Sequence, residues 1–268
     1  DPNGHRLVLA IGCFIENLSI AAGALGFESD IKLLSDDCSG DDMAAVTLRK
    51  SALKPYPLER LTLRKTVKNG YLPGAMRKDH LAALSEPLAG HFFYFPRGES
   101  HGECIRKGAV DSFREWLDSR EAQEEHIHWL RVGDDEARKN MDGLTTEGME
   151  IKGPVGWLVR SFFRADDFTK GFMKRETMKF AGKTAGEGAG YAIITGYGRT
   201  VAGMIELGRR FERMALLARE MNIGIHPMTQ MLEMPSGREL IGSNHRPGID
   251  PQLILRIGYI DNYPDPVT

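Results

Sequence analysis

Residues 207–233 read LGRRFERMALLAREMNIGIHPMTQMLE, and they form the most informative stretch of the chain. Apolar side chains recur over 204–221 at the spacing of one helical face, which predicts a long amphipathic helix. The following residues, 222–227, contain Gly and Pro and are predicted to be the turn that ends this helix. Two short apolar runs, YAIIT at 191–195 and LILRIGY at 253–259, are predicted to be strands.

A second stretch resembles the end of this helix. ENLSIAAGALG at 16–26 aligns without gaps with ERMALLAREMN at 212–222, and the alignment places Glu16 on Glu212. Residues 11–25 are themselves predicted to be a helix that ends at a glycine. A diverged internal duplication would explain the match, and chance similarity of two generic amphipathic helices is the alternative.

The remaining elements follow from the same periodicities. Strands are expected at 31–34, 44–48 and 91–95, and helices at 75–88 and 103–130. The stretch 153–183 alternates aromatic residues with Lys and Arg, a pattern found in helices that lie on a membrane surface. We expect instead a helical flap that packs on the same protein and turns its cations to water.

Composition sets limits on function. The chain has 268 residues and a formal net charge of -2, which fits one large domain or two small ones. The near-neutral charge argues against a general role in binding nucleic acid or coating a membrane. Apolar runs are shorter than the ~20 residues of a spanning helix, so none is expected.

Three separate cysteines, Cys13, Cys38 and Cys104, imply no disulfide framework, and no signal peptide is recognised. A cytoplasmic location is expected on this basis. Because the chain opens at Asp1 without Met, its natural start and an export signal could lie upstream.

Common catalytic motifs are a poor match. The glycines of 196–203 have the wrong spacing for a dinucleotide-binding loop. His101 with Cys104, and His126 with His128, lack the partner pairs of a structural zinc site, so no metal is predicted.

The stretch RLTLRKT at 60–66 is the best candidate for an anion site. Alternate residues share one face in an extended or first-turn geometry, so Arg60, Thr62 and Arg64 would point the same way. Guanidinium groups bind phosphate through several N–H donors, and threonine adds a neutral donor. A phosphomonoester would suit such a row. The spacing alone leaves a solvated basic turn equally open.

Taken together, this motif and a long helix that ends in a Gly-x-x-Pro turn resemble the nitroreductase family of FMN-dependent oxidoreductases. The similarity is to the Acg-like branch, whose members carry two nitroreductase-like halves in one chain. The segments that resemble this branch are DPNGHRLVLAIGCFIENLSIAAGALGF (1–27), RLTLRKT (60–66), EEHIHWLRVGDDEARKNMDGL (124–144), the stretch 207–233, and PQLILRIGYIDNYP (251–264).

The resemblance implies an α+β, nitroreductase-like fold that is a single-chain pseudo-dimer with an incomplete first half. Residues 1–54 would be the C-terminal part of the first half, and 55–268 the second half, with the flap at 153–183. FMN is the implied cofactor. Its phosphate would lie on Arg60, Thr62 and Arg64, and the flavin ring near the backbone of Pro227, Met228, Thr229 and Gln230. No side chain is implied as a catalytic residue, because the flavin carries the chemistry.

The implied activity is ping-pong hydride transfer from NAD(P)H through FMN to a small-molecule electron acceptor, such as a nitroaromatic or a quinone, in a bacterial protein. Thr229-Gln230 stand where many nitroreductases have Glu-Gly, so a protein that sequesters FMN without turnover is the alternative. Further FMN contacts of the family would lie before Asp1 and after Thr268. Further homodimerisation stays open.

Overall fold

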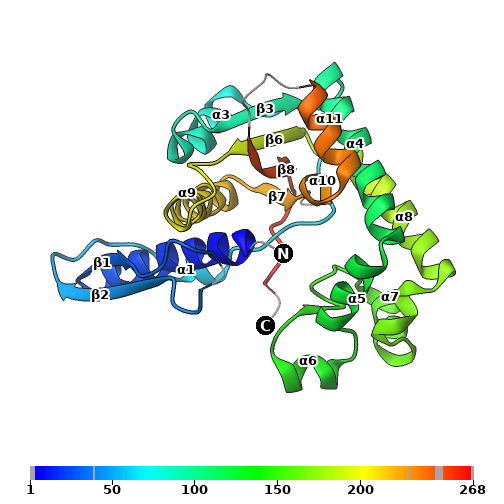
Figure 1. Ribbon diagram of the computed structural model, residues 1–268, viewed down its shortest axis with the longest axis horizontal. Coiled ribbons are helices and arrows are strands. Elements are labelled where there is room, and N and C mark those ends of the chain that lie inside the picture. The colour runs from blue at the N-terminus through cyan, green and yellow to red at the C-terminus, as the bar shows by residue number, and fades with distance from the viewer. Residues whose placement is uncertain (1–3, 39, 229, 245–249, 267–268) are drawn as a thin grey trace.

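The computed structural model describes residues 4–38, 40–228, 230–244 and 250–266. At its centre lies a four-stranded antiparallel sheet with the strand order β3-β6-β8-β7 (Figure 1). The strands are Phe92–Pro96 (β3), Gly190–Thr195 (β6), Pro251–Tyr259 (β8) and Ile223–Pro227 (β7). Helices cover both faces of this sheet, which confirms the predicted combination of helices and strands in an α+β fold.

Strand β7 corrects one prediction. The residues after the long helix were expected to form only a turn, but Ile223–Pro227 pair with β8 along their whole length. The turn is confined to Met221 and Asn222, and Asn222 has a positive φ of 52°. Ile223 and Ile225 are buried and fall on alternate positions, so the short run has the period of a strand. The strand has only five residues, the last of them a proline, and this is too short for a period of two to be recognised in the sequence.

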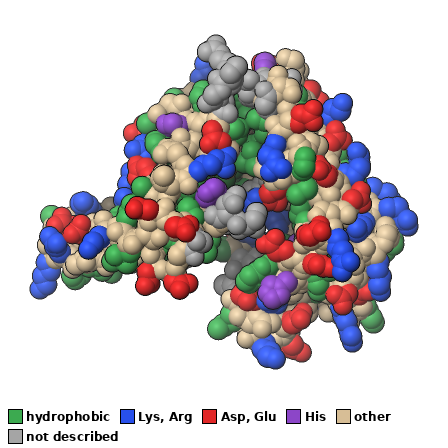
Figure 2. Space-filling model, in the orientation of Figure 1, with side chains coloured by type: hydrophobic (Ala, Val, Ile, Leu, Met, Phe, Trp, Pro, Cys, Tyr) green, Lys and Arg blue, Asp and Glu red, His purple; other side chains and the backbone are tan. Residues whose placement is uncertain are grey.

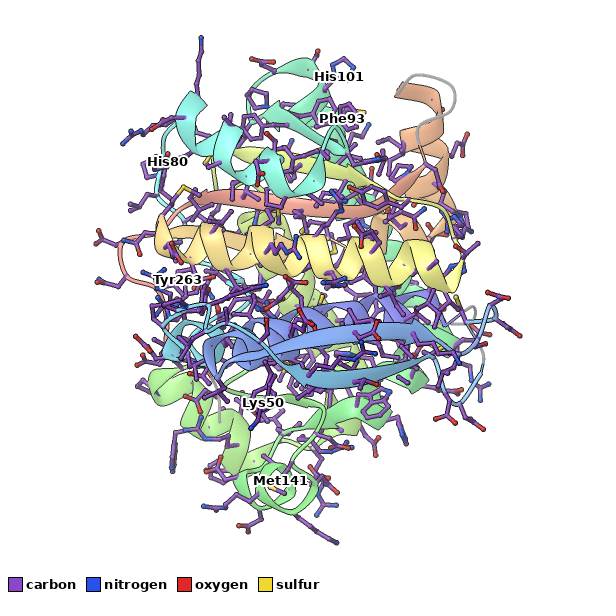
Figure 3. The ribbon with its side chains drawn as sticks, turned by 90° about the vertical axis from the view of Figure 1, so that its left-hand side faces the viewer. Lys50, His80, Phe93, His101, Met141 and Tyr263 are labelled. Carbon is purple, nitrogen blue, oxygen red and sulfur yellow. The ribbon has the colours of Figure 1, made fainter. Side chains whose placement is uncertain are left out.

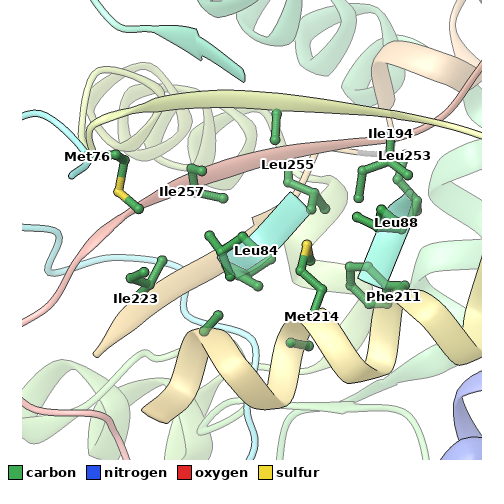
Figure 4. Close-up of a cluster of buried hydrophobic side chains, with 14 of the residues drawn as sticks. Met76, Leu84, Leu88, Ile194, Phe211, Met214, Ile223, Leu253, Leu255 and Ile257 are labelled. Carbon is green, nitrogen blue, oxygen red and sulfur yellow. The ribbon is translucent and has the colours of Figure 1, made fainter. Parts of the chain in front are cut away.

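The two faces of the sheet bury different sets of side chains. On one face, β6, β7 and β8 pack against α3, η1 and α9, and Figure 4 shows this cluster around Leu84, Met214 and Leu255. On the other face, Tyr191, Ile193 and Ile254 pack against α4, α10 and α11. The helices concerned are α3 (Lys78–Ser85), η1 (Glu86–Leu88), α9 (Val201–Glu220), α4 (Ser100–Asp118), α10 (Gln230–Glu233) and α11 (Pro235–Asn244).

Helix α1 (His5–Ala24) packs along α9 on the side away from the sheet. It leads into a hairpin of β1 (Phe27–Leu33) and β2 (Ala44–Lys50), which extends from the body as an arm on the left of Figures 1 and 2. By length and composition α1 is apolar enough to cross a membrane, so the expectation that no such run exists was wrong. Core helices of soluble proteins and signal sequences meet the same test, and one such helix is weak evidence.

The end of α1 and the end of α9 have the same backbone geometry. Both helices span 20 residues. The residues that close them, Leu25 and Met221, have φ of -100° and -95° and the same ψ of 8°. The next residue has a positive φ in each case, 80° at Gly26 and 52° at Asn222, and a strand begins directly after it. The sequence alignment of these two stretches is thus also a structural match.

Residues 100–185 form a mainly helical region beside the sheet (Figure 1, right). The predicted helix over 103–130 is divided at Ser119, whose extended backbone (ψ 121°) ends α4 and caps the next helix. The stretch 153–183 forms two α-helices joined by a short 3-10 helix, and Leu130, Val132, Val159 and Phe168 form a small core of its own. The further elements are α5 (Arg120–Trp129), β4 (Leu130–Arg131), α6 (Asp134–Asn140), β5 (Leu144–Thr145), α7 (Gly153–Phe162), η2 (Ala165–Thr169) and α8 (Gly171–Ala185).

A one-turn helix, α2 (Glu59–Thr62), and the loop that follows it connect the hairpin arm to the rest of the chain. This loop runs beside the C-terminal half of α9 and reaches the free edge of β7, where Val67 N donates to Ile225 O at 3.0 Å. Tyr71 then bridges to Ile260, just beyond β8. The 60–72 stretch therefore lies against the sheet edge next to the predicted flavin turn.

Candidate functional site

The two arginines of the R-x-T-x-R motif both face α9. Arg60 forms an ion pair with Glu220, and Arg64 Nε lies 2.9 Å from Glu212 Oε1. Arg60 lies within α2 and Arg64 two residues beyond its end, and both guanidinium groups reach the same neighbouring helix. Thr62 lies exposed instead, and its hydroxyl donates to Glu59 O at 3.0 Å. The structure brings Arg60 and Arg64 together on α9 but not Thr62.

The two ion pairs differ in their exposure to water. The Arg60–Glu220 pair leaves 42% and 33% of its side chains exposed, whereas Glu212 is fully buried. Asn17 of α1 also donates to Glu212 Oε1, at 3.1 Å. Removing a partner from a buried carboxylate is costly, while an exposed pair is worth little. Arg64 is therefore fixed in the structure, and Arg60 is free to exchange its partner.

A buried thiol lies next to the same carboxylate. Cys13 of α1 donates through Sγ to Gly208 O at 3.3 Å. Burial, together with the nearby negative charge of Glu212, raises the pKa of Cys13 to about 12. The thiol therefore stays protonated and is a poor nucleophile.

The predicted flavin turn links β7 to α10. Pro227 is the last residue of β7 and pairs with Leu255, and Met228 N donates to Ile254 O at 2.7 Å. Gln230 begins α10. Thr229 lies outside the described residues. The backbone N–H of Met228 is thus already bonded within the sheet. Any hydrogen bond from this turn to a flavin would have to come from another group.

Tyr263 holds the motif loop from the C-terminal side. Its hydroxyl donates to Lys65 O at 2.8 Å, and the guanidinium of Arg219 lies over its ring at 5.2 Å. Tyr263 is labelled in Figure 3. Lys65 Nζ donates in turn to Asp265 O at 3.1 Å. The segment after β8 therefore supports the loop that carries Arg64 and Lys65.

A group of buried basic side chains near Pro227 was missed by the sequence analysis. Arg256 lies in the middle of β8 and is fully buried, and His226 is its neighbour on β7. Arg256 Nη2 donates to Lys68 O at 2.5 Å and to His226 Nδ1 at 3.2 Å. Its guanidinium lies over the ring of Tyr71 at 4.7 Å. A single arginine within LILRIGY was the signal, because apolar strands rarely bury a charge.

These groups perturb one another's protonation. Burial, and then the charges of Arg256 and Lys68, lower the pKa of His226 to about 3. Burial also lowers the pKa of Lys68, with Glu150 acting in the opposite direction. In α5, burial and the charge of Lys68 lower the pKa of His126. Several positive or potentially positive groups therefore converge here, with Glu150 as their acidic neighbour.

Within the described ranges, no three His, Cys, Asp or Glu side chains gather where they could hold a metal ion. Two open hollows elsewhere in the described part of the chain are rich in arginine. One, of about 390 Å³, is lined by Arg97, Glu103 and Arg106, and the other, of about 170 Å³, by Arg131, Arg138 and Arg160 among others. Arg106, Arg131, Arg138 and Arg160 are paired with neighbouring carboxylates.

Comparison with known proteins gives one solved structure to report. No family model and no curated protein matches the chain. The crystal structure of a nitroreductase-like family protein from Bacillus cereus is similar over 81% of this chain and 93% of that chain. The identity is 14% and the TM-score is 0.40, a likeness that by itself assigns neither a family nor an activity.

Proposed function

We propose that the protein binds FMN and works as an oxidoreductase of the nitroreductase type. The proposal rests on the sequence resemblance and on one structural observation, the hydrogen bond from Val67 N to Ile225 O at 3.0 Å. This bond fixes the loop after Arg64 to β7, two residues before Pro227. Two segments far apart in the sequence, each expected to contact the cofactor, therefore lie at one edge of the sheet.

The residues of the motif fit a phosphate to different degrees. Arg60 pairs with Glu220 in a solvent-accessible contact, so its guanidinium can turn to a phosphate at little cost. Thr62 is exposed, and its hydroxyl would have to leave its bond to Glu59 O to donate to the same group. Arg64 is held by the buried Glu212 and would position the loop. In this proposal Arg60 and Thr62 bind the phosphate, and Arg64 supports them from behind.

At the other end of the site, the groups available to a flavin ring follow the described hydrogen bonds. Met228 N–H is bonded to Ile254 O, so Gln230, the first residue of α10, is the proposed source of N–H donors to the ring. Bound FMN would supply the hydride chemistry itself, and the protein would bind, orient and shield it. NAD(P)H is the proposed reductant, and a nitroaromatic or quinone the proposed acceptor.

The proposal includes two diverged halves, because the packing of α1 on α9 is reciprocal. Glu16 of α1 is paired with Arg213 at 2.5 Å, and Glu212 of α9 accepts from Asn17 at 3.1 Å. In the alignment, Glu16 corresponds to Glu212 and Asn17 to Arg213. Each contact therefore has a counterpart with the roles of the two helices exchanged, as in the self-complementary interface of a two-fold dimer.

Reduction of the flavin-loaded protein tests the activity. The protein would be loaded with FMN, freed of excess flavin and mixed with NADPH or NADH without oxygen. Loss of the oxidised flavin absorbance, followed by its return when a quinone or nitroaromatic is added, is expected. A bound flavin that neither nucleotide reduces would favour the FMN-sequestering protein instead.

A further inference from the structure

Arg256 is a buried charge without a carboxylate partner among the described residues. It is fully buried, and its Nε and Nη1 have no hydrogen-bond partner among the described residues. No described carboxylate forms an ion pair with it; the carbonyl of Lys68 accepts from its Nη2, and the Tyr71 hydroxyl is a second oxygen close enough to interact with it. A buried guanidinium normally has its N–H groups bonded and a carboxylate nearby.

The groups around Arg256 add a second basic side chain and further N–H donors, and they supply no carboxylate that pairs with it. Lys68 lies in the loop that supplies this carbonyl, and His126 approaches Lys68 from α5. A guanidinium can only donate, so His226 Nδ1 accepts from Arg256, and the neutral imidazole carries its proton on Nε2. That remaining N–H is a further donor. Four separate parts of the chain thus contribute cations or N–H donors to one place.

Glu150 is the acid that reaches this cluster. Its Oε1 accepts from the backbone N–H of Lys68 at 3.1 Å. The backbone of Glu150 has a φ of 61°, a conformation that residues other than glycine adopt only when their surroundings impose it. The carboxylate neutralises part of the charge of Lys68 but does not form a hydrogen bond to Arg256 in the described contacts.

We propose that Arg256, Lys68 and His226 form a binding site for a phosphate group, with Glu150 as an internal carboxylate that competes for it. The positive charges of Arg256 and Lys68 match the charge of a phosphate dianion, and the unpartnered nitrogens of Arg256 supply donors to its oxygens. Lys68, His226 and Glu150 are only partly buried, which gives the site an approach from solvent. The proposal stands without FMN, because inorganic phosphate is a sufficient ligand.

Phosphate binding to the full chain tests the site. The affinity of inorganic phosphate would be measured by titration calorimetry at constant ionic strength, for the natural sequence and for K68M, R256M and E150Q. K68M and R256M should each weaken binding at least tenfold. E150Q should strengthen it several-fold, because the competing charge is removed while the side chain keeps its shape.

The controls separate this site from a general effect of charge or folding. R199M removes an exposed arginine that pairs with Asp250, and its phosphate affinity should stay unchanged. Because E150Q predicts a gain, misfolding of R256M cannot imitate the full pattern. No saturable phosphate binding, or an equal affinity in the natural sequence, K68M and E150Q, would overturn the proposal.

A competition experiment identifies the source of the phosphate group. If FMN displaces inorganic phosphate from the natural sequence, the site takes the phosphate of the flavin in place of Arg60 and Thr62. If both bind together, the site takes a separate phosphate compound. FMN binding without any phosphate site would refute this inference and leave the proposed flavin function standing.

Discussion

Gly12 of α1 and Gly208 of α9 meet where the two helices cross. A Cβ built on Gly12 would lie 3.0 Å from Gly208 Cα, and a Cβ built on Gly208 would lie 2.9 Å from Gly12 Cα. Each glycine also faces a backbone carbonyl of the other helix. Gly12 faces Ile205 O, and Gly208 faces Leu9 O. The closest approach of the two helices thus depends on the absence of a side chain at two corresponding positions.

Gly208→Ala should therefore destabilise the protein. The added methyl group would overlap the backbone of α1, and overpacking of this kind costs about 1–3 kcal/mol. Gly182→Ala is a matched control within α8, because a Cβ there meets nothing within 4 Å. It should be neutral or stabilise by up to about 1 kcal/mol through helix propensity. Urea unfolding of both variants measures the difference, and an equal free energy of unfolding would contradict the close crossing.

Arg64→Ala should lower the folding stability strongly, and Arg60→Ala only slightly. Arg64→Ala leaves the fully buried Glu212 with Asn17 as its described partner, which should cost about 3–5 kcal/mol of folding stability. Arg60→Ala breaks a solvent-accessible pair and should cost less than about 1 kcal/mol. Glu212→Gln in the Arg64→Ala background should restore much of the loss, because the buried charge is removed. Equal destabilisation by both arginine variants would refute this division of roles.

His226 should make the protein less stable in acid. Its folded pKa of about 3 lies below the ordinary value near 6.5, so the unfolded chain takes up the proton first. Its contribution is complete above pH 6.5 and is lost as the pH falls toward 3. Each pKa unit corresponds to about 1.4 kcal/mol, so the total is of the order of several kcal/mol.

His226→Gln isolates this effect from the carboxylates, which titrate in both proteins. The free energy of unfolding would be measured for both proteins between pH 7 and pH 4, and the natural sequence should lose more stability over this range. Parallel curves would mean that His226 titrates normally.

Cys13 should resist alkylation in the folded protein. Burial and Glu212 raise the pKa of its thiol to about 12, so the reactive thiolate is scarce at neutral pH. Iodoacetamide labelling followed by mass spectrometry should modify Cys13 in urea but not in the native protein. Labelling at the same rate in both conditions would place the thiol at the surface.

The long-period features of the fold could be predicted from the sequence. The apolar faces of α1 and α9 recur over 20 residues each, and the strands YAIIT and LILRIGY are mostly apolar, the second with Arg256 at its centre. Strand β7 was missed because its five residues are too short to show a period of two beside a glycine and a proline. Local patterns of this kind identify helices and strands, but they do not show which of these elements pack against one another.

The site was less predictable for a different reason. The motif Arg60-x-Thr62-x-Arg64 is visible in the sequence, but its ion partners Glu220 and Glu212 lie far along the chain on α9. Arg256 was visible as a charge within an apolar strand, yet its closeness to Lys68 depends on how the loop meets the edge of the sheet. Tertiary packing decides which cations are compensated and which stay available to a ligand.

Equilibrium titration of the flavin-free protein with FMN, followed by quenching of flavin fluorescence, tests the central claim most directly. We predict saturable binding of one FMN per chain, weakened about tenfold or more by Arg60→Ala, because a charged hydrogen bond contributes about 1.5–3 kcal/mol. Arg199→Ala, which removes an exposed arginine paired with Asp250, should bind as tightly as the natural sequence. Absence of saturable binding, or equal affinity in both arginine variants, would contradict the assignment of FMN to this site.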